Sequence, residues 1–145
     1  KKIKFNNKII HQSKLLNYFS DNMESEKVEK ELEKRLKKIK KNKKYYFSTK
    51  DIILIESLIS DGIKISDKYS SILELYNSNI PTDIEVMIND GEMAMILLRL
   101  VEIIGEDDLN NLGSESLYFI LSTLNKLNID KIRNNIILKT FPLKV

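Results

Sequence analysis

Four acidic residues are the first candidates for chemistry in this sequence. Glu106, Asp107 and Asp108 are consecutive, and Glu102 precedes them by about one helical turn. Paired carboxylates can bind a hard cation or transfer protons. Their spacing does not match the EF-hand loop, which places acids at alternate positions. We favour a solvated acidic cap for the following turn, because carboxylates complement a helix N-terminus. A cation site or an acid–base pair is the alternative.

A second candidate is the basic run that precedes Tyr45 and Tyr46. Its members are Lys34, Arg35, Lys37, Lys38, Lys40, Lys41, Lys43 and Lys44. Lysines neutralise phosphates and aromatic rings stack on bases, so the run has the ingredients of a nucleic-acid contact. It contains little arginine and no signature of a known nucleic-acid-binding motif. An anionic protein, an anionic lipid surface and a charged helix that only faces solvent are the alternatives.

The sequence contains few residues of the types that usually carry out catalysis. His11 is the only histidine, and there is no cysteine. We expect the His11 side chain to be exposed, and a single histidine cannot form a metal site on its own. The motifs of serine hydrolases, P-loop proteins, dinucleotide-binding proteins and zinc proteases are absent. We therefore predict a non-enzymatic protein without a cofactor or metal, with a carboxylate-based enzyme as the alternative.

Gly91–Gly105 is the most apolar run of the chain, and it contains one unusual residue. Arg99 lies among Met, Ala, Leu, Ile and Val residues, and Glu102 follows it by three positions. Because arginine is rarely buried without a partner, we predict a structural ion pair between Arg99 and Glu102, with a ligand anchor as the alternative. The run is shorter than the roughly 20 residues that cross a bilayer. We predict that it forms the central helix of the core.

The elements that position these residues are predicted to be helices. Only 2 prolines and 4 glycines occur in 145 residues, which favours long helices over a turn-rich β fold. The segment 21–44 has the pattern of a charged helix that begins at Asp21 or Ser25. Its acids precede its bases, which suits the helix dipole. One narrow apolar stripe runs along it, formed by Val28, Leu32, Leu36 and Ile39.

Helix boundaries are marked most clearly after residue 47. Ser48, with Asp51 three positions later, predicts a capping box for a helix over 49–61, and Gly62 suits its end. Further helices are expected over 67–77, 114–127 and 130–140, with Ser114 as an N-cap. Because short connections make neighbouring helices antiparallel, we predict an all-α fold. It is an antiparallel helical bundle or a short, α-solenoid-like stack of helical hairpins, with a long charged N-terminal helix.

Charge divides the chain into two parts. Residues 1–50 hold 16 Lys/Arg and 6 Asp/Glu, whereas residues 51–145 hold 8 and 15. We predict a basic N-terminal arm and charged helix over 1–47 and a compact acidic all-α domain over 48–145.

Our first hypothesis is a non-enzymatic helical protein–protein interaction or scaffold module. We expect it to be a subunit or the C-terminal part of a larger protein or assembly, with another protein as its partner and no transmembrane segment. The alternative is a nucleic-acid-associated protein that binds phosphate through the basic helix 34–44.

Overall fold

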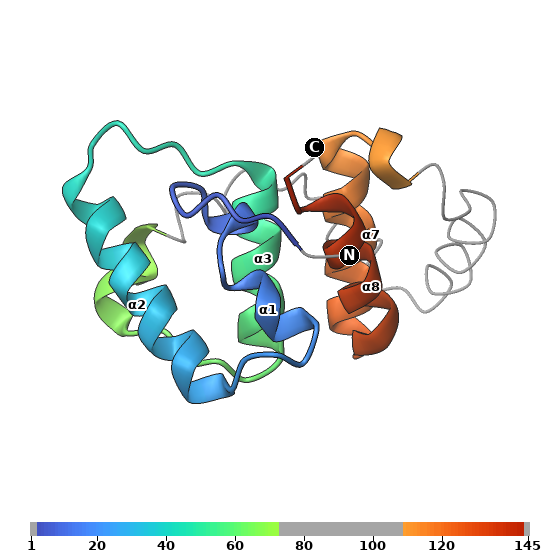
Figure 1. Cartoon of the computed structure of the whole chain (residues 1–145), viewed down its shortest axis with the longest axis horizontal. Helices are drawn as coiled ribbons and strands as arrows, with labels where there is room; N and C mark the ends of the chain where they lie inside the picture. Colours follow the sequence, from blue (N-terminus) through green and yellow to red (C-terminus); the bar gives the residue numbers. More distant parts are fainter. Residues whose placement is uncertain (1–2, 73–108, 144–145) are drawn as a thin grey trace.

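The computed structural model describes residues 3–72 and 109–143, which are helical and contain no strand (Figure 1). This confirms the all-α prediction for the described part of the chain. The α-helices are α1 (Leu16–Phe19), α2 (Ser25–Lys41), α3 (Thr49–Ser60), α7 (Ser114–Lys126) and α8 (Asp130–Thr140). Short 3-10 turns are η1 (Ile10–Gln12), η2 (Asp67–Tyr69) and η3 (Leu109–Asn111).

Some of the predicted features fall outside the described residues. These are the apolar helix Gly91–Gly105, the ion pair between Arg99 and Glu102, and the acidic residues Glu106, Asp107 and Asp108. The helix predicted over 67–77 begins as a 3-10 turn at Asp67–Tyr69, and its residues 73–77 also lie outside the described residues.

Helix α2 forms because its apolar residues recur at helical spacing. Val28, Leu32 and Leu36 are buried, and Ile39 is half-buried against the same core. The rest of the helix is highly charged, so only this narrow stripe faces the protein. The N-cap is Glu24, without a side-chain capping bond, instead of Asp21 or Ser25.

Helix α3 begins and ends at the predicted signals. Ser48 Oγ accepts the Asp51 backbone N–H at 3.2 Å, and Asp51 Oδ2 accepts the Ser48 backbone N–H at 3.0 Å. This reciprocal pair confirms the capping box. After Ser60 the chain turns at Gly62, whose φ of 91° is a left-handed conformation that glycine adopts without strain.

Helices α7 and α8 follow each other closely. Asn128 makes the turn between them with a φ of 57°, a left-handed conformation. Asparagine is one of the few non-glycine residues that adopt this conformation readily. The boundaries match the predicted helices within a residue. The expected N-cap at Ser114 is wrong, because Ser114 is already helical and Gly113 occupies the cap position.

One hydrophobic core joins all the described helices. In Figure 1, α3 lies in the middle, with α2 on one side and α7 and α8 on the other. α3 packs against α7 and against η1, and α1 packs against α8. The N-terminal segment contributes Ile10, Leu15, Leu16 and Phe19 to this core. The division of the chain at residue 47 stays a prediction.

Candidate functional site

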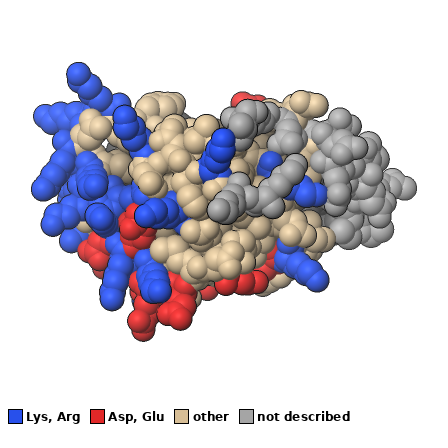
Figure 2. Space-filling view, viewed as in Figure 1, with Lys and Arg blue, Asp and Glu red and all other residues tan. Residues whose placement is uncertain are grey.

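The lysines of the predicted basic run lie at one end of the molecule. Figure 2 shows Lys and Arg gathered over the end that α2 forms, with acidic side chains beneath them. We call these residues the basic face: Lys34, Lys37, Lys38, Lys40, Lys41, Lys43 and Lys44. All seven are exposed.

Four of these lysines share one side of α2. Lys34, Lys38 and Lys41 are separated by four and three residues, and Lys37 lies between them, so all four point away from the buried apolar stripe. The helix dipole favours cations in the last turn. However, like charges at these spacings repel, at about 0.2–0.5 kcal/mol per pair. The four-lysine stripe therefore does not follow from helix stability alone.

The positive charges of the basic face are mostly unneutralised within the described residues. Six of the seven ammonium groups have no hydrogen-bond or ion-pair partner there, and Lys40 alone donates, to the Lys68 carbonyl at 3.4 Å. Of the acids on α2, Glu31 pairs with Arg35 at 2.8 Å and Glu33 pairs with Lys68 at 3.5 Å. Glu31 and Glu33 thus pair with residues outside the lysine stripe, and no ion pair to a stripe lysine occurs among the described residues.

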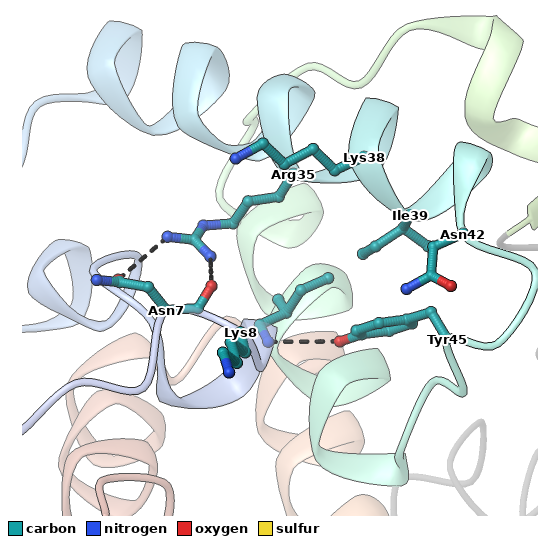
Figure 3. A pocket seen from close by; sticks show the side chains of 8 residues that line it. Asn7, Lys8, Arg35, Lys38, Ile39, Asn42 and Tyr45 are labelled. Carbon is teal, nitrogen blue, oxygen red and sulfur yellow. Dashed lines mark hydrogen bonds between the residues drawn. The ribbon is translucent and has the colours of Figure 1, made fainter.

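A cavity of about 350 Å³ borders the basic face, between the N-terminal loop and α2 (Figure 3). It is lined by Asn7, Lys8, Ile10, Arg35, Lys38, Ile39, Asn42 and Tyr45. Arg35 fastens the loop to the helix, because Nη1 donates to the Asn7 carbonyl at 2.6 Å and Nη2 to Asn7 Oδ1 at 3.2 Å. Lys8 from the N-terminal loop, with Arg35 and Lys38 from α2, places basic side chains on both sides of the cavity.

The two predicted aromatic residues have different surroundings. Tyr46 is 81% exposed beside the lysines. Tyr45 is half-buried, and its ring packs edge-on against Phe47 with centroids 5.2 Å apart. Its hydroxyl donates to Asp51 Oδ2 at 3.1 Å and accepts the Ile10 backbone N–H at 3.4 Å. Burial, with the negative charge of Asp51, raises the pKa of Tyr45 to about 12.

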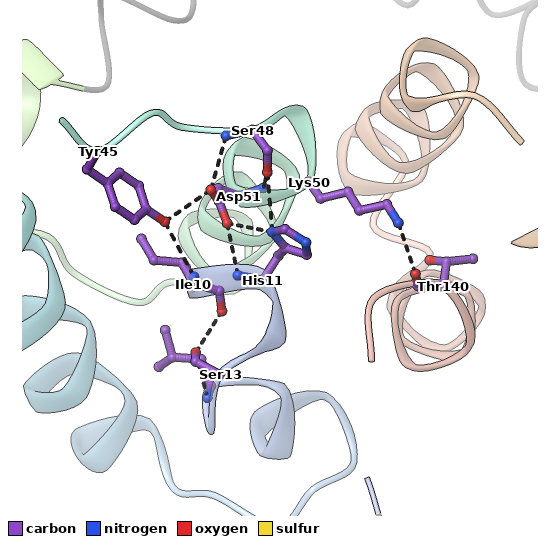
Figure 4. A network of polar contacts seen from close by, with 9 residues as sticks. Ile10, His11, Ser13, Tyr45, Ser48, Lys50, Asp51 and Thr140 are labelled. Carbon is purple, nitrogen blue, oxygen red and sulfur yellow. Dashed lines mark hydrogen bonds and ion pairs between the residues drawn. The ribbon is translucent and has the colours of Figure 1, made fainter. Parts of the chain in front are cut away.

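His11 lies in a polar cluster at the start of α3 (Figure 4). Its Nδ1 is 2.7 Å from Asp51 Oδ1, and its backbone N–H donates to the same oxygen at 2.9 Å. Burial works to raise the pKa of Asp51, but the hydrogen bonds from His11 and the Ser48 backbone outweigh it and hold this pKa below its usual value. The side chain of His11 is only 12% exposed. The prediction of an exposed histidine is wrong, because the buried Ile10 draws the segment inward.

The fold brings together serine, histidine and aspartate, the residue types of a hydrolytic triad. In a triad the acid and the serine occupy opposite nitrogens of the imidazole. Here Asp51 Oδ1 and Ser48 Oγ both approach Nδ1 of His11, at 2.7 and 3.2 Å. Ser48 Oγ also caps α3. We therefore assign the cluster to holding the N-terminal segment against α3.

A second polar cluster surrounds Arg133, whose side chain is fully buried on α8. Its Nη1 and Nη2 donate to the two Asp61 carboxylate oxygens at 2.7 and 2.6 Å. Nη1 also donates to Asn125 Oδ1 at 3.0 Å, and Nε donates to Asn134 Oδ1 at 3.0 Å. Tyr18 OH donates to Asp61 Oδ2 at 2.8 Å. Every guanidinium nitrogen thus has a partner, which a buried cation requires.

The Arg133 cluster changes the acid–base properties of its neighbours. Burial works to raise the pKa of Asp61, but hydrogen bonds from Arg133 and Tyr18 outweigh it, so this pKa lies below its usual value. Burial raises the pKa of Tyr18 to about 12, and the adjacent Asp61 carboxylate adds to the effect. Asp61 therefore stays ionised and Tyr18 stays protonated across neutral pH.

Sequence reasoning missed two features of the site. Asn7 and Lys8 lie beside the basic run although they are at least 26 residues from it in sequence, and no local pattern links them to it. Arg133 had a signal, because helical spacing places it with Ile129, Ile136 and Ile137 on the apolar side of α8. The binding role of the basic run with Tyr45 and Tyr46 stays a prediction.

No family model matches the sequence, and no similar curated protein or solved structure was found. Within residues 3–72 and 109–143, no helix combines the length and apolar character that a bilayer crossing needs.

Proposed function

We propose that this protein is a non-enzymatic binding module that holds the phosphate backbone of a nucleic acid on its basic face. One observation carries the proposal: four exposed lysines, Lys34, Lys37, Lys38 and Lys41, share one side of α2 and lack counter-charges among the described residues. Such a stripe repels itself, and an anionic ligand relieves that repulsion. Neutralising phosphates and releasing their counterions drives this kind of binding.

Nucleic acid fits this face better than a protein or a bilayer does. The centre of a protein interface is depleted in lysine and rich in apolar and aromatic groups. The basic face consists of seven lysines, with the exposed ring of Tyr46 next to them. Membrane-binding helices insert an apolar side into the bilayer. The apolar stripe of α2 is buried in the core instead, so it has nothing to insert.

The proposal is tested by replacing the four lysines of the stripe with glutamine. The matched control replaces four exposed lysines outside α2, Lys4, Lys14, Lys64 and Lys131, so both variants lose the same net charge. Affinity for a fluorescent oligonucleotide is measured by anisotropy. We expect the stripe variant to lose about 100-fold in affinity at low salt and the control to lose much less. Equal losses in the two variants would refute a localised binding face.

A protein partner is the second candidate, and an acidic cavity favours it. This cavity of about 610 Å³ is lined by Tyr18, Asp21, Met23, Glu24, Ser25, Asp61, Asp130 and Asn134. Its charge suits a basic peptide segment, as expected if the protein is a scaffold or a subunit of a larger assembly. Affinity capture from native lysate with and without nuclease separates the two candidates. Partners retained after nuclease treatment favour the protein, and partners that vanish favour nucleic acid.

We further propose that the helices are arranged as an antiparallel bundle or a short stack of hairpins, with the charged helix along one side. The packing of α3 against α7 and of α7 against α8 supports this arrangement. In that arrangement the basic face and the acidic cavity belong to different surfaces of one scaffold.

A further inference from the structure

We propose that the cavity between the N-terminal loop and α2 receives one unstacked base of a single-stranded nucleic acid. This inference rests on the proposed function and makes it more specific, because it selects single strands over duplexes. Bases become available for insertion only when they are unstacked, as they are in single strands, loops and ends. The cavity of about 350 Å³ lies within the size range of small-ligand pockets, about 300–1,000 Å³.

The apolar part of the cavity provides a surface for a flat ring. Figure 3 shows the Tyr45 ring on one side of the cavity with Ile39 above it. The ring is already fixed, by its hydroxyl contacts with Asp51 and Ile10 and by its edge-on packing against Phe47. Because a fixed ring loses little freedom when a base packs on it, the cavity is preorganised for such a ligand.

The polar part of the cavity suits the edge of a base. Asn7 and Asn42 line it from opposite elements, and an amide offers both donors and acceptors, as base edges do. In Figure 3 the Asn42 amide lies close to the Tyr45 ring. Asn42 Oδ1 accepts the Lys44 backbone N–H at 3.1 Å, which orients the amide and leaves its NH2 group to donate.

The charged part of the cavity continues the basic face. Lys8 lines it from the loop and Lys38 from α2, and both side chains are exposed. Neither ammonium group has a hydrogen-bond or ion-pair partner among the described residues. A nucleotide whose base enters the cavity would keep its phosphates outside, near Lys8 and the lysine stripe to which Lys38 belongs. The cavity therefore combines the three kinds of contact that a nucleotide makes.

Arg35 acts as a positioning residue for this cavity. It pairs with Glu31, and its bonds to Asn7 hold the loop wall against the helix wall. Its Nε–H is buried without a partner among the described residues. Buried donors without a partner are uncommon in folded proteins. The Arg35 Nε–H is such a donor, and it belongs to the side chain that joins the loop to α2.

The test compares three fluorescent ligands of about 12 nucleotides, a length within the usual site size of single-strand binders. They are a single DNA strand of mixed sequence, its duplex, and an abasic strand of the same length. We expect the abasic strand to bind roughly 5- to 100-fold more weakly than the complete strand, because it lacks the base contact. The duplex should bind as weakly as the abasic strand.

The key variant is Asn42→Leu, which removes the amide but keeps the size and the net charge. We expect it to lose about 5-fold in affinity for the complete strand and nothing for the abasic strand. The matched control is Asn135→Leu at an exposed position of α8, which should bind like the unaltered protein. If Asn42→Leu does not fold by circular dichroism, Lys8→Gln replaces it, with Lys4→Gln as its exposed control.

The outcomes separate this inference from the proposed function. Equal binding of single strand and duplex, both lost in the lysine-stripe variant, would overturn the cavity and leave the basic face in place. A preference for the complete strand that survives Asn42→Leu, or Lys8→Gln in its place, would also overturn the cavity. If none of the three ligands binds, both proposals fail.

Discussion

The Arg133 cluster and the basic face show two opposite ways in which this protein handles positive charge. Arg133 is fully buried and has partners on all three guanidinium nitrogens. The lysines of the stripe are exposed, and their ammonium groups have no partners among the described residues. A buried charge that loses its partner is strongly destabilising, whereas an exposed one is solvated by water.

This difference separates structural charges from charges that are available for binding. The hydrogen bonds of Arg133 are all made within the protein, so it has nothing left to offer a ligand. The stripe lysines make no such bonds, and their mutual repulsion favours an anionic ligand. We therefore expect changes in the Arg133 cluster to affect folding, and changes in the basic face to affect binding.

The largest effect is expected from Arg133→Met. The substitution leaves the Asp61 carboxylate without its cation, so we expect a loss of about 3–5 kcal/mol in the free energy of unfolding. Urea denaturation measures this loss. Below the unfolding transition, oligonucleotide affinity should be unchanged. Arg133→Lys should recover only part of the stability, because lysine cannot form the two-pronged contact. A stability loss under about 1 kcal/mol would show that the buried cluster is not structural.

Replacing the four stripe lysines by glutamine should have the opposite profile. The free energy of unfolding should stay the same or rise by a few tenths of a kcal/mol for each relieved like-charge pair. The same denaturation experiment measures this. A variant that loses both stability and binding would break the distinction between the two regions.

A stability loss between these two extremes is expected at the polar cluster around His11. Ser48→Ala removes the N-cap of α3 and the contact with His11, so we expect a loss of about 1 kcal/mol in the free energy of unfolding. Ser66→Ala is a suitable control, because Ser66 precedes η2 without a side-chain capping bond. Equal effects at the two serines would contradict the role of the capping box.

The smallest effect concerns the tyrosines of the two buried clusters. The pKa of both Tyr18 and Tyr45 is raised from 10.0 to about 12. A raised folded-state pKa means that the stabilisation is complete below pH 10 and is lost as the pH rises toward 12. Absorbance titration should show these two hydroxyls ionising about two pH units above the ordinary value for tyrosine. Removing each tyrosine with phenylalanine assigns the late ionisation, and an ordinary pKa at both would contradict the buried hydrogen bonds.

Local signals in the sequence predicted much of the fold. The capping box at Ser48, the glycine stop after α3 and the apolar stripe of α2 each depend on residues within a few positions of one another. Such contacts can be predicted because helical spacing determines which side chains meet.

Contacts between distant segments could not be predicted in the same way. His11 meets Asp51 across 40 residues, and Arg133 meets Asp61 across 72. Asn7 and Arg35 meet only because the N-terminal segment folds onto α2. These pairings depend on how the helices pack against one another, and the sequence pattern of a single segment does not predict that packing.

The central claim is that the lysine stripe binds phosphate, and the salt dependence of oligonucleotide binding tests it most directly. For four lysines on a single strand we expect log K to fall against log salt with a slope of roughly −3. The stripe variant should bring this slope close to zero, while the four-lysine control should keep it. A slope near zero in the unaltered protein, or the same slope in both variants, would contradict the claim.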